Sequence, residues 1–287
     1  MALLVTVGNL CDLHVVARSF LILLSEKLSY DLKLSLLIMA LFMWLQDQNN
    51  DPFVIHRLLH KSDNVALEMV IREAVHYINF LSSDSSENLS INPPFFGNPL
   101  GLTIPIKSLY QSKYTAISGI KRYLRTTCFR VFFDILSSKL RFDSSIRFLP
   151  YQLIHIPGSP NPTFGPIYFK NWPRSHVFTT NFEICSWINA QGYVEDEEDR
   201  SLYVTFSHGF SVSKDELRKL FTSNFGDCVQ NVDMSHTTHS RQVLFARLIM
   251  KCVEVIDFIL KGKTVAKFKI RGKHVWAKKY KCQKPCM

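Results

Sequence analysis

Three aromatic side chains in the last third of the chain are of the types that stack on flat aromatic groups such as nucleic-acid bases. Tyr203 and Phe245 each lie within a run of alternating apolar residues, and Trp276 lies within a third such run. An exposed aromatic ring stacks on a nucleic-acid base whatever the identity of that base, and each contact of this kind contributes about 1 to 3 kcal/mol. Lys and Arg side chains beside such rings neutralise the phosphates that join the bases.

The positive charge of the chain is concentrated around these aromatic residues. Residues 1–200 carry 18 Lys and Arg and 18 Asp and Glu, whereas residues 201–287 carry 16 and 6, which accounts for the whole net charge of +10. Between Lys261 and Lys284 there are ten basic residues and no acidic residue. A regional basic excess favours a polyanionic partner, because neutralised phosphates release counterions. A solvated basic face that aids solubility is the alternative.

Sequence patterns of the common enzyme classes are absent. The chain contains no GxSxG, no HExxH, no phosphate-binding GxxxxGK[ST] and no dinucleotide-binding glycine pattern, so we expect no catalytic activity and no cofactor. His56 and His60 are four residues apart on a predicted helix, but no acid lies between them. We therefore interpret them as partly buried structural histidines and expect no metal site. The seven cysteines are scattered without a CxxC pair, which favours a reducing intracellular compartment, nucleus or cytoplasm.

Residues 1–149 are expected to form a mostly helical domain. Apolar residues lie on nearly every side of the segment Tyr30–Gln46, which predicts a helix buried in a helical core. Asp63–Leu81 and Ser112–Leu140 also show helical spacing. Charged residues interrupt the apolar amino-terminal stretch, so we expect core helices and no membrane span, with a cleaved or anchoring segment as the minor alternative.

Residues 150–200 are expected to form an extended segment that ends in an acidic linker. The stretch from Pro150 to Pro173 is dense in Pro, Gly and aromatic residues, a composition that resists regular structure. Five consecutive acids at residues 195–199 indicate a solvated boundary before the next domain. We also hypothesise that this acidic segment competes with a polyanion for an adjacent basic surface.

Residues 201–284 combine the alternation of a sheet with the spacing of two helices. Four strands are predicted, at Ser201–Ser207, Asp227–Met234, residues 240–250 and residues 274–280. One helix is predicted after Ser213, with Glu216 completing a capping box, and a second at Lys251–Gly262. The order of elements is βαββαβ, so the chain as a whole is predicted to be an α+β protein.

Two of these strands carry motifs that resemble those of the RNA recognition motif family, whose ferredoxin-like fold is a four-stranded sheet backed by two helices. Leu202-Tyr203-Val204 is similar to the start of the family's strand-one motif, with Tyr203 at a base-stacking position. Arg241–Leu248 is similar to its strand-three motif, with Arg241 at the basic first position and Phe245 at a second stacking position.

The motifs also depart from the family's pattern. Gln242 replaces a glycine, Val243 and Leu248 replace aromatic residues, and Phe206 stands where strand one usually has Asn. Two of the three stacking positions are therefore retained. The whole chain is also similar to plant proteins in which a mostly helical amino-terminal half precedes one divergent domain of this kind.

The resemblance implies a non-catalytic protein that binds single-stranded RNA weakly and with low sequence specificity through one face of its sheet. The side chains that would form this surface are Tyr203, Thr205, Arg241, Val243, Phe245, Arg247, Trp276, Lys278 and Lys279. The alternative is a protein-interaction module, because some members of the family bind proteins through the sheet or the helices. The helical half would then be a docking scaffold for protein partners.

Overall fold

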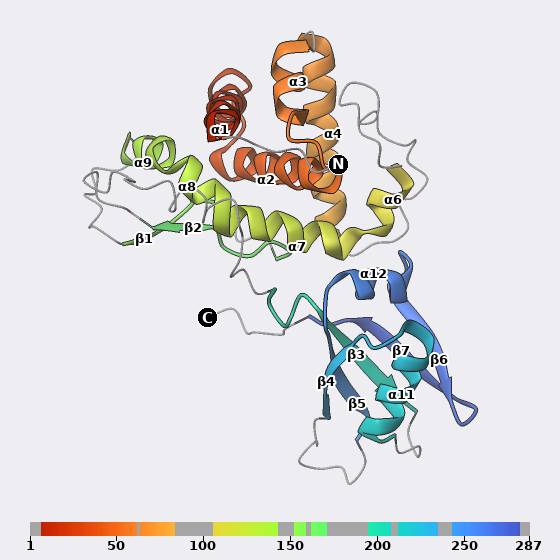
Figure 1. The fold of residues 1–287 in the computed structure, drawn as a ribbon. Coiled ribbons are helices and arrows are strands. Elements are labelled where there is room, and N and C mark those ends of the chain that lie inside the picture. Colours follow the sequence, from red (N-terminus) through yellow and green to blue (C-terminus); the bar gives the residue numbers. More distant parts are fainter. Residues whose placement is uncertain are drawn as a thin grey trace. The chain divides into compact units, whose positions relative to one another are not determined.

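The structure is a computed structural model that describes residues 7–61, 64–83, 106–142, 152–158, 162–170, 195–207, 212–234 and 243–281. These residues divide into two compact units. The helical unit contains the described residues of Met1–Ser83, Asn92–Ile106 and Gly119–Tyr193, and the sheet unit contains those of Lys107–Ser118 and Val194–Met287. Helices and a five-stranded antiparallel sheet are both present, which confirms the α+β prediction (Figure 1).

The helical unit consists mainly of α-helices joined by short π-helical turns. Its elements are α1 (Val7–Ile22), η1 (Leu23–Lys27), α2 (Leu32–Gln48), α3 (Val54–Lys61), α4 (Asn64–Ser82), η2 (Leu124–Cys128), α8 (Phe129–Val131) and α9 (Phe133–Phe142). Helices α6 (Ile106–Gln111) and α7 (Lys113–Tyr123) each contain residues of both units. Strands β1 (Leu153–His155) and β2 (Tyr168–Lys170) pair antiparallel, so part of the segment that was predicted to lack regular structure forms a small sheet.

Helix α2 is the buried centre of the helical unit. Its residues from Ser35 to Phe42 are all buried, so the helix is covered on every side, as its evenly apolar sequence predicted. The Asp31 side chain accepts a hydrogen bond from the Leu34 amide at 2.8 Å and so caps the helix. No helix in the described part of the chain is long and apolar enough to span a membrane.

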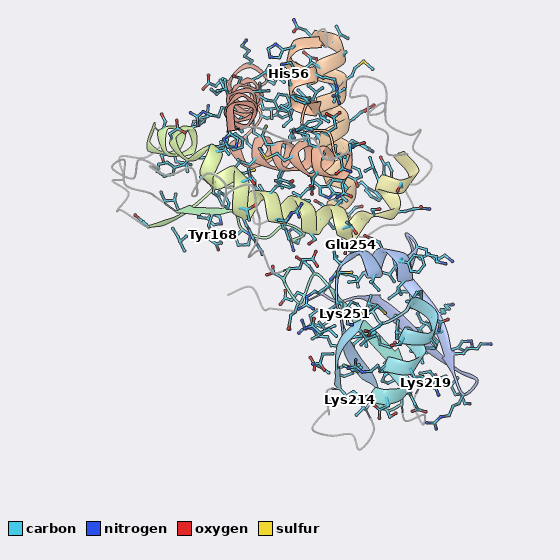
Figure 2. All side chains as sticks on the ribbon, in the orientation of Figure 1. His56, Tyr168, Lys214, Lys219, Lys251 and Glu254 are labelled. Carbon is cyan, nitrogen blue, oxygen red and sulfur yellow. The ribbon has the colours of Figure 1, made fainter. Side chains whose placement is uncertain are left out.

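Helix α3 begins with a side-chain cap, and its two histidines are not buried as predicted. The Asp51 carboxylate accepts a hydrogen bond from the Phe53 amide at 3.0 Å and pairs with Arg57 at 2.6 Å. The rings of His56 and His60 lie 4.4 Å apart, centroid to centroid. Both histidines are exposed rather than partly buried, because they lie on the outer side of an amphipathic helix. Figure 2 labels His56 on this helix.

The sheet unit contains the four predicted strands and two predicted helices, together with one further strand. Its elements are β3 (Ser201–Phe206), α11 (Lys214–Phe225), β4 (Val229–Met234), β5 (Phe245–Met250), α12 (Glu254–Leu260), β6 (Val265–Ile270) and β7 (Lys273–Lys279). The strands lie in the order β4-β5-β3-β7-β6 across the sheet, and every neighbouring pair is antiparallel. Strand β3 is therefore central, with β5 and β7 on either side (Figure 1).

Local signals define the ends of α11 as the sequence predicted. The Glu216 amide donates to the Ser213 hydroxyl at 3.2 Å, and the Ser213 amide donates to the Glu216 carboxylate at 2.9 Å, which completes a capping box. Gly226 follows the helix with a φ of +78°, a backbone conformation that glycine adopts without steric cost.

One hydrophobic core lies between the sheet and the helices α11 and α12. Alternate residues of the strands enter it, together with the inner sides of the two helices. Its principal members are Leu202, Val204, Leu217, Phe221, Ala246, Leu248, Ile256, Ile259, Val275 and Ala277. Because successive residues of a strand point to opposite faces, the residues between these core members form the other face of the sheet, which we call the outer face.

Candidate nucleic-acid interface

The outer face is defined by the residues that alternate with the core. Tyr203 and Thr205 on β3 alternate with buried apolar residues, and so do Trp276 and Lys278 on β7. Burial of one set of side chains fixes the direction of the other set. Trp276 and Lys278 are directed outward because Val275 and Ala277, the residues that alternate with them, are both fully buried.

Six of the nine predicted binding residues lie together on the outer face, in two rows that cross the three central strands. The first row is Arg247, Tyr203 and Lys278, and the second row is Phe245, Thr205 and Trp276. Directly opposed residues of an antiparallel pair lie on the same face, with Cβ atoms roughly 5 Å apart. The register therefore brings two aromatic rings of neighbouring strands, a third ring and two cations within reach of one ligand.

Tyr203 and Phe245 occupy diagonal positions and stack on each other. Their ring centroids are 5.3 Å apart and the ring planes differ by 28°, which is a stacked arrangement that aromatic pairs prefer. The Lys278 ammonium group lies 5.3 Å from the centroid of the Tyr203 ring, within the range of a cation–π contact. Partial burial raises the pKa of Tyr203 above its ordinary value. The rings form one joint platform, where the sequence alone suggested two.

Trp276 forms a second aromatic site, and the unpredicted strand β6 extends the outer face beyond it. The half-buried Trp276 indole lies 5.9 Å from the His274 ring, centroid to centroid. Lys267 on β6 lies opposite Trp276, and Lys269 lies opposite His274. Both lysines are exposed, so β6 adds two cations to the edge of the face.

Strand β6 was not predicted, although its residues alternate in type and a glycine-containing dipeptide, Arg271-Gly272, follows them. The segment Val265–Ile270 alternates exposed residues with residues directed to the core. Arg271 and Gly272 follow with φ values of +48° and +80°, the conformation of a two-residue hairpin turn. The density of lysines in this region obscures the alternation of the residues between them.

Arg247 is held at one end of the outer face by three contacts. Its Nε donates a hydrogen bond to the Ser201 hydroxyl at 3.1 Å. A terminal guanidinium nitrogen lies 3.8 Å from a carboxylate oxygen of Glu197, and the guanidinium carbon lies 4.6 Å from the centroid of the Tyr280 ring. A phosphate that binds Arg247 therefore competes with Glu197 for the same cation.

The acidic run before β3 is an ordered part of the sheet unit, whereas its like charges indicated a solvated linker. Residues 197–200 form a turn, and Asp199 and Arg200 are only 8% and 7% exposed. The Arg200 carbonyl accepts a hydrogen bond from the Met250 amide at 2.8 Å, and the Arg200 guanidinium donates to the Met250 carbonyl at 2.7 Å. These bonds continue the pairing of β3 with β5 and so fix the acidic turn against the end of the sheet.

The other three predicted residues do not belong to the outer face as the structure describes it. Arg241 lies outside the described residues. Val243 precedes β5 and packs against the core, because the alternation of this strand begins only at Phe245. Lys279 lies opposite Leu202, and its ammonium group donates to the Glu198 carbonyl. A shift of one residue along a strand reverses the face, which is why Lys278 and Lys279 differ.

No protein-family model, curated protein or solved structure matches this chain. Within the ranges that the structure describes, no three His, Cys, Asp or Glu side chains are arranged to hold a metal ion. The candidate interface is therefore defined by the geometry and the chemistry of its own side chains.

Proposed function

We propose that the outer face of the sheet binds single-stranded RNA weakly and with low sequence specificity, without catalysing a reaction. The observation that carries this proposal is the presence of Tyr203, Phe245, Trp276 and Lys278 on one face of one sheet. Aromatic rings stack on any base, and cations attract every phosphate. Such a surface gains affinity from stacking and charge and has few groups that distinguish one base from another.

The proposal includes membership of a divergent branch of the RNA recognition motif family. Its support is the order β3, α11, β4, β5, α12, β7 along the chain, with β4-β5-β3-β7 across the sheet. The two strands whose motifs resemble those of the family, β3 and β5, are neighbours at the centre of the sheet. Strand β6 is then an addition at one edge.

Two features of the outer face favour weak rather than tight binding. Tyr203 and Phe245 cover part of each other, so the pair offers one platform to a base. Arg247 is already paired with Glu197, so a bound phosphate gains less binding energy from Arg247 than from a cation that only water surrounds. Affinity then depends mainly on Trp276, the joint platform and the lysines around them.

Fluorescence polarisation with a labelled oligouridine of about 12 nucleotides tests the proposal on the full chain. Binding should be measurable at low salt and should fall steeply as salt is raised. The double substitution Tyr203→Ala and Phe245→Ala should weaken binding about tenfold or more, because about 1.4 kcal/mol corresponds to a factor of ten and one stacked base is lost.

Phe258→Ala is the matched control for this experiment. Phe258 lies on α12 and is 60% exposed, so its removal deletes an exposed ring that is not on the outer face. The control should retain the affinity of the unmodified chain. The proposal fails if oligouridine does not bind at low salt, or if the control and the double substitution lose the same affinity.

A protein-interaction role is the second candidate, and the same Phe258 is the observation that favours it. Its ring contacts Phe225 edge to face, with centroids 5.8 Å apart, and the Lys261 ammonium group lies 5.7 Å from its centroid. Exposed aromatic rings beside cations are common at protein interfaces. Absence of oligouridine binding would favour this candidate over the first.

A further inference from the structure

Strand β6 forms a basic edge next to the aromatic residues of the outer face. Its exposed residues are Val265, Lys267 and Lys269, whereas the residues between them are directed to the core. From Lys261 to Lys281 the chain has nine Lys and Arg residues and no Asp or Glu. Two of the three exposed residues of β6 are therefore cations, and neither β6 nor β7 contains an acid, although Arg271 in the turn after β6 pairs with Glu216.

The register fixes the distance between this edge and the rings. Lys267 lies opposite Trp276 on the neighbouring strand. Lys267 and Lys269 are two residues apart along β6, which corresponds to about 7 Å, so the two ammonium groups lie on the same face close enough to contact one ligand. Three strand spacings separate Phe245 on β5 from Lys267 on β6, which corresponds to about 14 Å.

Protection of a sheet edge explains these lysines only in part. Charged side chains on an edge strand discourage pairing with a strand of another chain. Such protection does not require that the lysines adjoin Trp276, or that Lys278 adds a further cation on the same face. A ligand with bases and linked phosphates accounts for both features, because its bases stack on the rings and its phosphates bind the neighbouring cations.

We infer that β6 is a phosphate-binding edge, and that a single-stranded nucleic acid crosses the sheet from the Tyr203–Phe245 pair over Trp276 to Lys267 and Lys269. The inference rests on the proposed function and adds the path of the ligand to it. Bases stack on the central strands, and phosphates contact the edge strand. A duplex fits less well, because its bases stack on one another and are not free to stack on Trp276.

The test compares two double variants of the full chain that lose the same charge. Lys267→Ala with Lys269→Ala removes two cations from β6. Lys214→Ala with Lys219→Ala removes two exposed cations from α11, the helix whose other side packs on the core (Figure 2). The dissociation constant for a labelled oligouridine of about 12 nucleotides is measured over a range of salt concentrations.

The slope of log K against log salt reports the number of phosphates that are neutralised. Each phosphate contact contributes about 0.7 to this slope for a single strand, so the β6 variant should reduce the slope by about 1.4. The α11 variant should leave the slope unchanged. Trp276→Ala should lower the affinity without changing the slope, because it removes stacking and no charge.

The possible failures are distinguishable. The inference is overturned if the slope of log K against log salt is the same for all the proteins, or if the two lysine variants reduce it equally. The proposed function still stands in that case if the Tyr203 and Phe245 substitutions weaken binding. No binding by the unmodified chain at low salt overturns both. Competition by polyglutamate as effective as that by unlabelled oligouridine also overturns the inference, because an acidic peptide has no bases to stack on Trp276.

Discussion

At the residue scale, we propose that the pair of Glu197 and Arg247 limits how strongly the outer face attracts a phosphate. The two side chains approach to 3.8 Å at the end of the first row, beside Tyr203. The Arg247 side chain is 24% exposed and the Glu197 side chain 56%, so a pair of this kind contributes little to folding. In our proposal its main effect is on ligand binding. The Glu197 carboxylate already pairs with the Arg247 guanidinium and repels a second anion.

Glu197→Gln should therefore increase the affinity for oligouridine by about two- to fivefold, the factor that corresponds to an exposed ion pair of up to about 1 kcal/mol. Glu198→Gln is the matched control, since it removes the same charge one residue away. The contact of Glu198 with Lys279 is made by its backbone carbonyl, which the substitution retains. Polarisation measurements at one low salt concentration compare the two variants, and equal gains would show that general repulsion, not release of Arg247, is responsible.

At the element scale, helix α7 begins on a carboxylate that α12 supplies. Asp257 accepts hydrogen bonds from the amides of Tyr114 and Thr115 at 3.0 and 2.8 Å, and from the Thr115 hydroxyl at 2.7 Å. Burial raises the pKa of Asp257 from its ordinary value of 3.8 to about 6, although these hydrogen bonds act in the opposite direction. The cost of burying the charge therefore exceeds the gain from capping.

This pKa predicts that the contribution of Asp257 to stability decreases as the pH rises. The folded pKa lies above the unfolded one, so the contribution is complete below pH 3.8 and is lost as the pH rises through about 6. The difference corresponds to about 3 kcal/mol. Urea unfolding of the unmodified chain and of Asp257→Asn should show a difference in unfolding free energy that falls by up to this amount across the window. A difference that does not change with pH would contradict the prediction.

Elements with local signals could be predicted from the sequence, and elements that depend on distant partners could not. Ser213 and Glu216 lie three residues apart and cap each other, so the start of α11 follows from its own sequence. The acidic turn is ordered by Met250, about fifty positions further along the chain, through bonds that no local pattern contains. Like-charge repulsion predicted a linker, but pairing of Arg200 with a distant strand outweighs it.

In the candidate site, too, features with a local sequence signal could be predicted and features that depend on a distant strand could not. Alternation along β3 and β7 was sufficient to direct Tyr203, Trp276 and Lys278 to one face, because a strand has a period of two residues. The register of β3 against β5 could not be predicted from the sequence, and this register places the Tyr203 ring against the Phe245 ring. Two residues near the ends of strands were misassigned: Val243 lies before its strand begins, and Lys279 lies one position beyond the face that Lys278 occupies.

At the scale of the whole molecule, charge and candidate site belong to the same unit. Residues 1–200 carry equal numbers of acidic and basic residues, and the excess of +10 lies in residues 201–287, which contribute the whole five-stranded sheet. The charge would therefore attract a polyanion to the unit that also carries the half-buried rings of the outer face. The helical unit packs around α2, whose residues from Ser35 to Phe42 are buried, and in our proposal it does not contact RNA.

Photo-crosslinking tests the central claim most directly, because it reports where RNA lies on the full chain. The protein is bound to an oligouridine that carries a photoreactive base, irradiated and digested, and the crosslinked peptides are identified. The account predicts crosslinks to peptides that contain Tyr203, Phe245 and Trp276, with loss of crosslinking at high salt. Crosslinks confined to α11, α12 or the helical unit, or none at low salt, would contradict it.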